Sequence, residues 1–364
     1  MKISAITQIL EQWAPLAYAE DFDNVGLLVG NKDNDCENVL IAHDVSEAVV
    51  EEALQKKCQL IICFHPIIFK GLKSLTGKNY VEKTVIKAIE NKIAIYALHT
   101  ALDNHKEGIS FTLGKTIGLL NQRILIPQKN TLYQLTTYVP TAQKEIVLEA
   151  LHAAGAGAIG NYSQCSFSTL GEGQFLGDDH SNPQLGKQHT LIKVPEVKIQ
   201  VIVPKHCKNN VLNALQENHP YESVAYELIA VENLNPDIGL GSIGELSQPM
   251  QREDFMTHIK ESLHISSLRH SDSKKTMIKK VAVLGGSGSF CINAAIAQGA
   301  DALVTADLKY HDFYVPENGL LLVDAGHYET EHFTKKIIQD FLTKKILNFA
   351  FTLSEVNTNP VKYF

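Results

Sequence analysis

The sequence contains no CxxC pair, although it has six cysteines among its 364 residues. They are spread singly along the chain, at Cys36, Cys58, Cys63, Cys165, Cys207 and Cys291. Because a cysteine zinc site or a redox pair needs closely spaced thiols, this distribution disfavours both. We expect buried free thiols instead, as at Cys63, which lies inside an apolar run.

The sequence also lacks a surplus of positive charge and a long apolar segment. Its formal net charge is −7, which argues against a general nucleic-acid surface because such a surface needs a basic stripe. No apolar run approaches the roughly 20 residues that cross a bilayer. The first ten residues lack the apolar core of a signal peptide. We therefore expect a cytoplasmic protein with no membrane partner.

The sequence does contain a regular alternation of apolar runs and helical patterns near its N-terminus. Residues 38–46, 58–66 and 93–104 have the apolar runs of strands, and residues 46–57 and 81–92 have helical spacing. This alternation predicts βαβ units with a mostly parallel sheet and helical cover. The hydrophobic content of 45% supplies enough core material for such a domain.

The middle of the chain has a different pattern, and the alternation then returns. Across residues 131–232, strand, helix and strand follow one another and repeat, which predicts a ferredoxin-like α+β domain. After it, strands again precede glycine turns and helices. The simplest interpretation is a discontinuous α/β domain, residues 1–130 and 233–364, with a separate domain inserted in its middle.

Potential metal ligands follow three predicted strands of the α/β domain. His65 follows one strand, His99 and Asp103 follow the next, and His327 and Glu331 follow the last. In open α/β sheets, ligands gather at the carboxyl ends of the strands. Nitrogen and oxygen donors of this kind bind Zn, Mn, Fe and similar divalent ions. These residues are therefore candidates for one metal site.

The spacing of His327 and Glu331 strengthens this interpretation. Residues at i and i+4 lie on one face of a helix, so both side chains can reach a common site. Gly326 permits a tight turn out of the strand, and a carboxylate is favoured near a helix N-terminus. A glutamate in this position can bridge two ions about 3.5–4 Å apart.

Each candidate also has an ordinary structural explanation. A single histidine after a strand, such as His65, is more often a hydrogen-bonding loop residue. Asp103 can cap a turn through its side chain, and His327 and Glu331 can form a surface pair on a helix. Taken together these explanations weaken, because separate strands would have to end in donors by chance.

Other motifs support weaker predictions. The glycine turn at residues 284–289 can expose N–H groups to a phosphate, although a simple strand-to-helix turn explains it better. Lys309 and His311 follow another predicted strand and can contact a substrate phosphate or transfer protons, or can belong to a solvated loop. For Asp44 and Asn24 we favour capping or turn roles.

Six motifs resemble those of the NIF-three-like family, also called the dinuclear metal-centre family or the GTP cyclohydrolase 1 type 2 homologs. They occur in order on both sides of the middle segment, which itself resembles the PII/CutA-like insert of longer bacterial members. The motifs are FDNVGLLVG (22–30), CFHPIIFKGLKSL (63–75), ALHTALDN (97–104), VAVLGGSGS (281–289), TADLKYHDF (305–313) and DAGHYETE (324–331).

The resemblance implies a pair of divalent ions, Zn, Mn or Fe, as cofactors. It places His65, Asp103, His327 and Glu331 as the ligands, with Glu331 touching both ions. The chain departs from the family pattern at Phe64, where some members have a histidine before His65. His99 then either completes the shell or orients a ligand from outside it.

The resemblance further implies a metal-dependent hydrolase acting on a nucleotide, with metal-activated water as the nucleophile. In the cyclohydrolase version, water attacks the imidazole carbon of guanine and formate leaves, while His99 and His311 transfer protons. The alternative is a non-catalytic metal-binding or regulatory protein whose insert senses a small molecule. The family also implies self-association, with trimers formed through the insert and a homohexamer overall.

Overall fold

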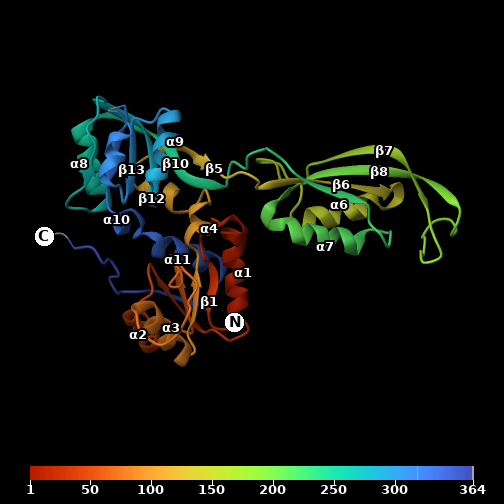
Figure 1. The fold of residues 1–364 in the computed structure, drawn as a ribbon, viewed down its shortest axis with the longest axis horizontal. Coiled ribbons are helices and arrows are strands. Elements are labelled where there is room, and N and C mark those ends of the chain that lie inside the picture. Colours follow the sequence, from red (N-terminus) through yellow and green to blue (C-terminus); the bar gives the residue numbers. More distant parts are fainter. Residues whose placement is uncertain (318, 363–364) are drawn as a thin grey trace. The chain divides into compact units, whose positions relative to one another are not determined.

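The computed structural model describes residues 1–317 and 319–362. The chain divides into two compact units, one formed by Met1–Pro127 with Asp237–Phe364 and the other, the insert, by Gln128–Pro236. Both units are mixed α/β structures, labelled along the chain in Figure 1. The borders of the insert lie slightly outside the expected residues Thr131 and Glu232.

The first sheet of the discontinuous unit has the strand order β1-β4-β3-β2-β15. Its central strands run parallel, and only β1 pairs antiparallel, with β4. β15, which comes from the C-terminal segment, therefore pairs with β2 at the edge of a sheet whose other strands come from the N-terminal segment. The strands are β1 (Gly26–Val29), β2 (Asn38–Ala42), β3 (Leu60–Cys63), β4 (Ala94–Ala97) and β15 (Ala350–Leu353).

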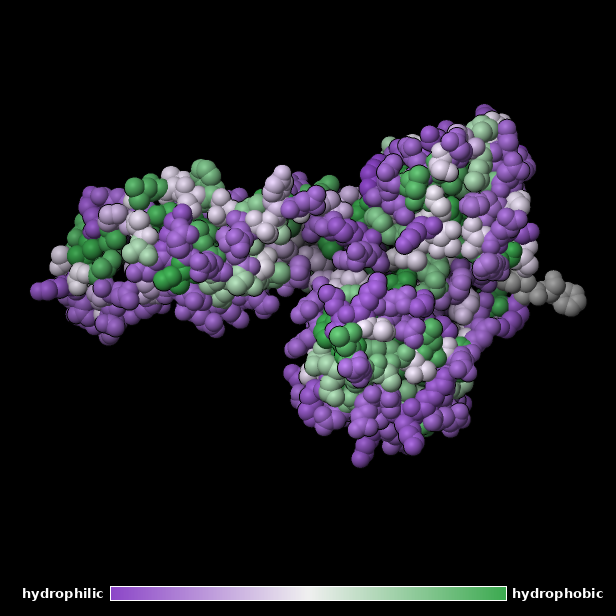
Figure 2. Space-filling model, turned by 180° about the vertical axis from the view of Figure 1, so that it is seen from behind, coloured by the Kyte–Doolittle hydropathy of each residue, from purple (hydrophilic) through white to green (hydrophobic). Residues whose placement is uncertain are grey.

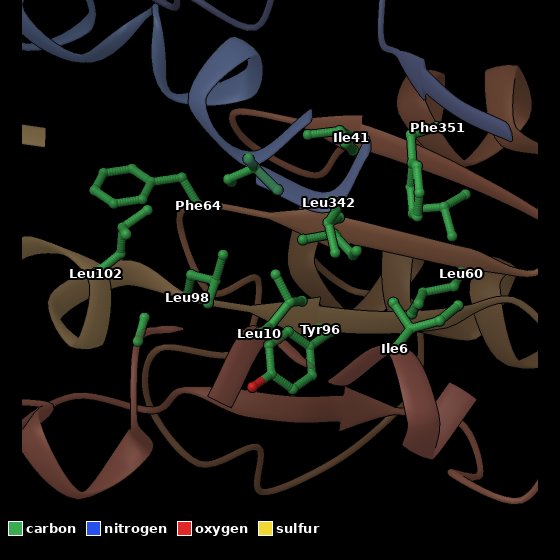
Figure 3. Close-up of a cluster of buried hydrophobic side chains, with 14 of the residues drawn as sticks. Ile6, Leu10, Ile41, Leu60, Phe64, Tyr96, Leu98, Leu102, Leu342 and Phe351 are labelled. Atoms are coloured by element: carbon green, nitrogen blue, oxygen red, sulfur yellow. The ribbon is translucent and has the colours of Figure 1, made fainter. Parts of the chain in front are cut away.

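Helices cover both faces of this sheet, which explains why its strands are continuous apolar runs. Val39 and Ile41 pack against α1 and α11, and Leu40 and Ala42 pack against α2 and α3. Figure 3 shows the first of these layers, in which Leu342 of α11 belongs to the same buried cluster as Ile41 and Tyr96. The helices are α1 (Ile3–Trp13), α2 (Glu47–Gln55), α3 (Tyr80–Glu90) and α11 (Thr334–Lys345).

The second sheet has the order β11-β14-β13-β12-β10-β5. Only β12, β13 and β14 are parallel neighbours, because β10 and β5 pair antiparallel beside them. The expectation of mostly parallel strands therefore holds for the first sheet but not for this one. The elements are β5 (Leu120–Pro127), β10 (Gly239–Gln251), β11 (Arg269–His270), β12 (Met277–Ser287), β13 (Ala302–Ala306), β14 (Leu321–Asp324), α5 (Ile109–Thr116), α8 (Arg252–Leu263) and α9 (Ile292–Ala297).

The insert is a four-stranded antiparallel sheet, order β7-β8-β6-β9. Its helices α6 and α7 share a buried core with β6 and β8. The elements are β6 (Leu132–Pro140), α6 (Lys144–Ala153), β7 (Ser166–Leu176), β8 (Leu191–Pro204), α7 (Lys208–Asn218) and β9 (Tyr226–Ala230). Strand, helix and strand thus alternate as the sequence predicts.

The remaining helices are short. They are α4 (His99–Asp103), α10 (His327–Glu331) and the 3-10 turns Leu16–Tyr18, Thr141–Gln143, Lys205–Cys207, Ser289–Cys291 and Tyr310–Tyr314. Within the described part of the chain, no helix has both the length and the apolar character to span a bilayer. All six cysteines are free thiols, and those outside the insert are buried.

Candidate metal centre

Three neighbouring parallel strands of the first sheet deliver histidines from their carboxyl ends. His43 directly follows β2, His65 lies just beyond β3, and His99 lies just beyond β4. Backbone bonds hold these ends in register: His65 N–H donates to the carbonyl of His43 (3.1 Å), and His99 N–H to that of Phe64 (2.9 Å). The centroid of the His65 ring therefore lies 4.7 Å from that of His43 and 5.2 Å from that of His99.

The parallel strands of the second sheet deliver a complementary set. After β14, Gly326 turns the chain with a φ of 93°, which favours glycine, and α10 then presents His327 and Glu331. Asp307, which follows β13, also has a positive φ of 56°. The His327 ring centroid lies 5.3 Å from that of His65, so donors from both sheets converge within one unit.

His65, His327 and Glu331 form a nearly equilateral triangle of donor atoms. His65 Nε2 lies 3.3 Å and His327 Nε2 lies 3.2 Å from Oε2 of Glu331, and the two Nε2 atoms are 3.4 Å apart. Ligands at about 2.0–2.1 Å from a tetrahedral zinc are separated by roughly 3.3–3.4 Å. The triangle thus has the size of one face of a metal-ligand tetrahedron.

The other ring nitrogens of these histidines are held by carboxylates. His65 Nδ1 lies 2.7 Å from Asp44 Oδ1, and His327 Nδ1 lies 2.7 Å from Asp307 Oδ2. A carboxylate on one ring nitrogen fixes the tautomer that offers the other to a metal. Glu331 is buried, and its Oε2 has no hydrogen-bond partner among the described residues. The donor set therefore fits a divalent cation.

In the absence of a cation, protons compensate the carboxylates. Burial would lower the pKa of His65, but the hydrogen bond with Asp44 and the negative charges of Glu331 and Asp44 outweigh it and raise the pKa to about 9. For His327, Asp307 and Glu331 likewise outweigh burial and raise the pKa to about 10. The pKa of Glu331 is lowered, because the two histidines outweigh the effect of burial.

We expect chelator-treated protein to lose stability between about pH 7 and pH 10. Below pH 6.5 both folded and unfolded states bind these protons, so the full stabilisation is present. As the pH rises through the folded-state pKa values of about 9 and 10, it is lost. Thermal unfolding across this range measures the effect. His327→Gln should flatten the decline, and an identical decline in that variant would contradict the assignment.

Asp103 and His99, both predicted from the sequence, lie close to this triangle. Burial and, after it, the charge of Glu331 raise the pKa of Asp103 well above its usual value. His99 Nδ1 lies 2.8 Å from Asp23 Oδ1. The φ of His99 is 28°, a conformation that non-glycine residues adopt rarely and mostly where the surroundings enforce it.

His311 is exposed, and its ring contacts Tyr310 and Tyr314. Neither ring contact involves a residue of the triangle, so the role of His311 in proton transfer stays a prediction. The same holds for Lys309, whose N–H bonds to Asp312 of the same turn.

Three residues have contacts at the cluster that their sequence motifs did not indicate. Asp44 was expected to cap a turn, but its carboxylate bonds to His65 and to Thr358 (2.7 Å). His43 carries the same signal as His65, a histidine at a strand end, and was not selected. Asp307 directly follows β13, and nothing in the sequence around it indicates that it would bond to His327.

A cavity of 540 Å³ opens beside the triangle. Its lining includes the carboxylates of Asp44, Asp307 and Asp324 and the guanidinium of Arg269. Arg269 forms an ion pair with Asp324. A cavity of this size is typical of small-molecule sites. The cluster is therefore accessible to a ligand of nucleotide size.

The Duf34/NIF3 (NGG1p interacting factor 3) family matches residues 1–360. The chain belongs to this family. A Halalkalibacterium halodurans relative named "GTP cyclohydrolase 1 type 2 homolog" is 37% identical over 100% of both chains. A Bacillus subtilis relative of the same name is 36% identical over 98% of this chain and 97% of its own. The resemblance found in the sequence motifs is thus confirmed.

Solved structures of Duf34/NIF3 proteins share the fold. A Bacillus cereus protein described as related to NIF3 superposes with a TM-score of 0.85 at 36% identity, covering 100% of this chain and 99% of that one. A Staphylococcus aureus protein superposes with a TM-score of 0.78 at 32% identity, with the same coverage. The family relationship therefore extends over the insert as well as the discontinuous unit.

Proposed function

We propose that this member of the Duf34/NIF3 family is a metal-dependent hydrolase that opens the imidazole ring of a guanine nucleotide. Its centre would hold two divalent ions through His65, Asp103, His327 and Glu331. The observation that carries the proposal is the triangle of donor atoms with edges of 3.2–3.4 Å. The name shared by the relatives supports the choice of substrate.

A second ion is supported by the carboxylates. Burial and the charge of Glu331 both raise the pKa of Asp103, and a bound cation would relieve the repulsion between the two carboxylates. When bound, the ions would lower the pKa of a coordinated water and supply hydroxide near neutral pH. Zn, Mn and Fe all suit such a mixed shell.

Residues of the chain would move the protons and hold the substrate. Asp23 holds the His99 ring next to His65, which supports a role for His99 in accepting and returning a proton. Arg269 supplies a cation to the cavity and can bind a phosphate group. His311, at the surface, would exchange protons with solvent.

The reaction consumes two waters. The first adds to the carbon between the two imidazole nitrogens, and the bond from that carbon to one nitrogen breaks, leaving a formamide. The second hydrolyses the formamide to formate and an amine. Each step needs a base for the attacking water and an acid for the leaving nitrogen, and His99 can serve as both in turn.

Formate release from GTP, with Mn or Zn added, tests the proposal directly. We expect wild-type protein to release formate and His327→Ala to lose both the activity and the bound metal, measured by elemental analysis. Two tightly held ions without formate from any nucleotide would refute the catalytic role and support a non-catalytic, regulatory one. Phosphate release instead would indicate a phosphoesterase.

For the insert we propose a ferredoxin-like, PII/CutA-like module that trimerises, within a homohexamer. Its antiparallel sheet carries exposed apolar side chains, and Figure 2 shows hydrophobic groups on its surface at the left. The exposed apolar side chains of the insert's sheet are Phe167, Leu170, Leu176 and Leu191, among others. Exposed apolar surface of this kind marks association sites. Sedimentation velocity of the full chain tests the assembly, and a monomer would refute it.

A further inference from the structure

We propose that His43 is a further ligand of the metal centre, so that its imidazoles come from three strand ends rather than two. This inference rests on the proposed metal site and adds a donor to it. His43 directly follows β2 and is 2% exposed. Its Nε2 lies 3.6 Å from Oε2 of Glu331, the carboxylate oxygen that also faces His65 and His327.

The distance suits a shared cation better than a hydrogen bond. At 3.6 Å, Nε2 and Oε2 are too far apart for a good hydrogen bond, but donors around one ion are separated by roughly this much. Nδ1 of His43 is buried and has no hydrogen-bond partner among the described residues. No hydrogen bond among the described residues therefore holds this ring in place, and its Nε2 faces the carboxylate at the centre of the triangle.

The neighbours of His43 also form a donor set. Donor atoms of His43, Asp44 and His65 all lie within 4.8 Å of one another. This set shares His65 with the triangle of His65, His327 and Glu331. The shared histidine therefore places His43 beside the donors of the triangle.

Sheet register relates His43 to Phe64. Ala42 of β2 pairs with Cys63 of β3, so the residues that follow, His43 and Phe64, lie side by side. Their rings stack with centroids 5.7 Å apart and planes at 24°. An imidazole at either position is therefore presented to the same cluster. In this chain, position 64 is apolar and position 43 carries the imidazole.

The test compares metal binding in wild type, His43→Leu and the double variant His43→Leu/Phe64→His. Leucine fills the buried position with an apolar side chain and removes the donor nitrogens. We expect His43→Leu to bind Zn at least about 10-fold more weakly and to alter the visible absorption of the Co-substituted protein. The double variant should recover both, because it returns an imidazole to the neighbouring register position.

The outcomes separate this inference from the proposed function. Unchanged Zn affinity and Co spectrum in His43→Leu, with wild type binding normally, would overturn the role of His43 alone. A wild type that binds no divalent ion would overturn the metal site and the role of His43 together. Thermal unfolding in chelator verifies folding, and His43→Gln replaces the leucine variant if that variant fails to fold.

Discussion

Glu331→Gln is expected to remove the bound metal while leaving the fold in place. Glutamine has nearly the same shape, but it lacks the charge that faces His65 and His327 at 3.2–3.3 Å. Mutation of a residue that only orients a metal ligand weakens metal affinity by about 10–100-fold. Loss of the central carboxylate, itself a ligand, should therefore weaken metal binding by more than about 100-fold. Elemental analysis after dialysis and Zn titration measure the effect.

Glu329→Gln is the matched control for this variant. Glu329 lies on the same helix, α10, and its Oε1 accepts a hydrogen bond from Asn359 (3.0 Å). The two substitutions change the net charge equally, so a difference between them isolates the position of the carboxylate. Wild-type metal content in Glu331→Gln, or equal losses in both variants, would contradict a coordinating role for Glu331.

Gly286→Ala is expected to weaken metal binding without touching a donor residue. Gly286 lies at the end of β12 with a φ of +66°, and a Cβ there would lie 2.3 Å from Oε1 of Glu331 and 3.3 Å from Cε1 of His327. The carboxylate would have to move away from the triangle. We expect an affinity loss of about 10–100-fold, as for other residues that position a ligand.

Gly299→Ala separates this steric effect from backbone strain. Gly299 has a similar φ of +70°, but a Cβ at this position would meet nothing within 4 Å. Both variants should lose about 1–2 kcal/mol of stability, the cost of a left-handed alanine. Only Gly286→Ala should also lose metal affinity in a Zn titration. Equal metal binding by the two variants would show that Gly286 does not constrain Glu331.

Local sequence signals identified the parts of the site that depend on a single strand end. The turn at Gly326 and the four-residue spacing of His327 and Glu331 are properties of one segment, and the structure presents both side chains together. His65 was identifiable for the same reason. The continuous apolar runs likewise predicted strands that are buried on both faces.

Relations between segments could not be predicted from these signals. Whether His43 faces the cluster depends on the register of β2 against β3, which single-strand patterns do not contain. Asp44 bonds to Thr358, a residue 314 positions away, so its local motif suggested only a cap. The second sheet became mixed because β10 and β5 join it from either side of the insert.

The discontinuity of the α/β unit has a consequence for biosynthesis. His65 and His327, whose Nε2 atoms are 3.4 Å apart, are separated by 262 residues. During translation the ribosome therefore synthesises the first set of donors long before the second, and β15 joins the first sheet only after both sets exist. A polypeptide that stops before His327 carries only the donors of the first sheet, so it cannot assemble the triangle.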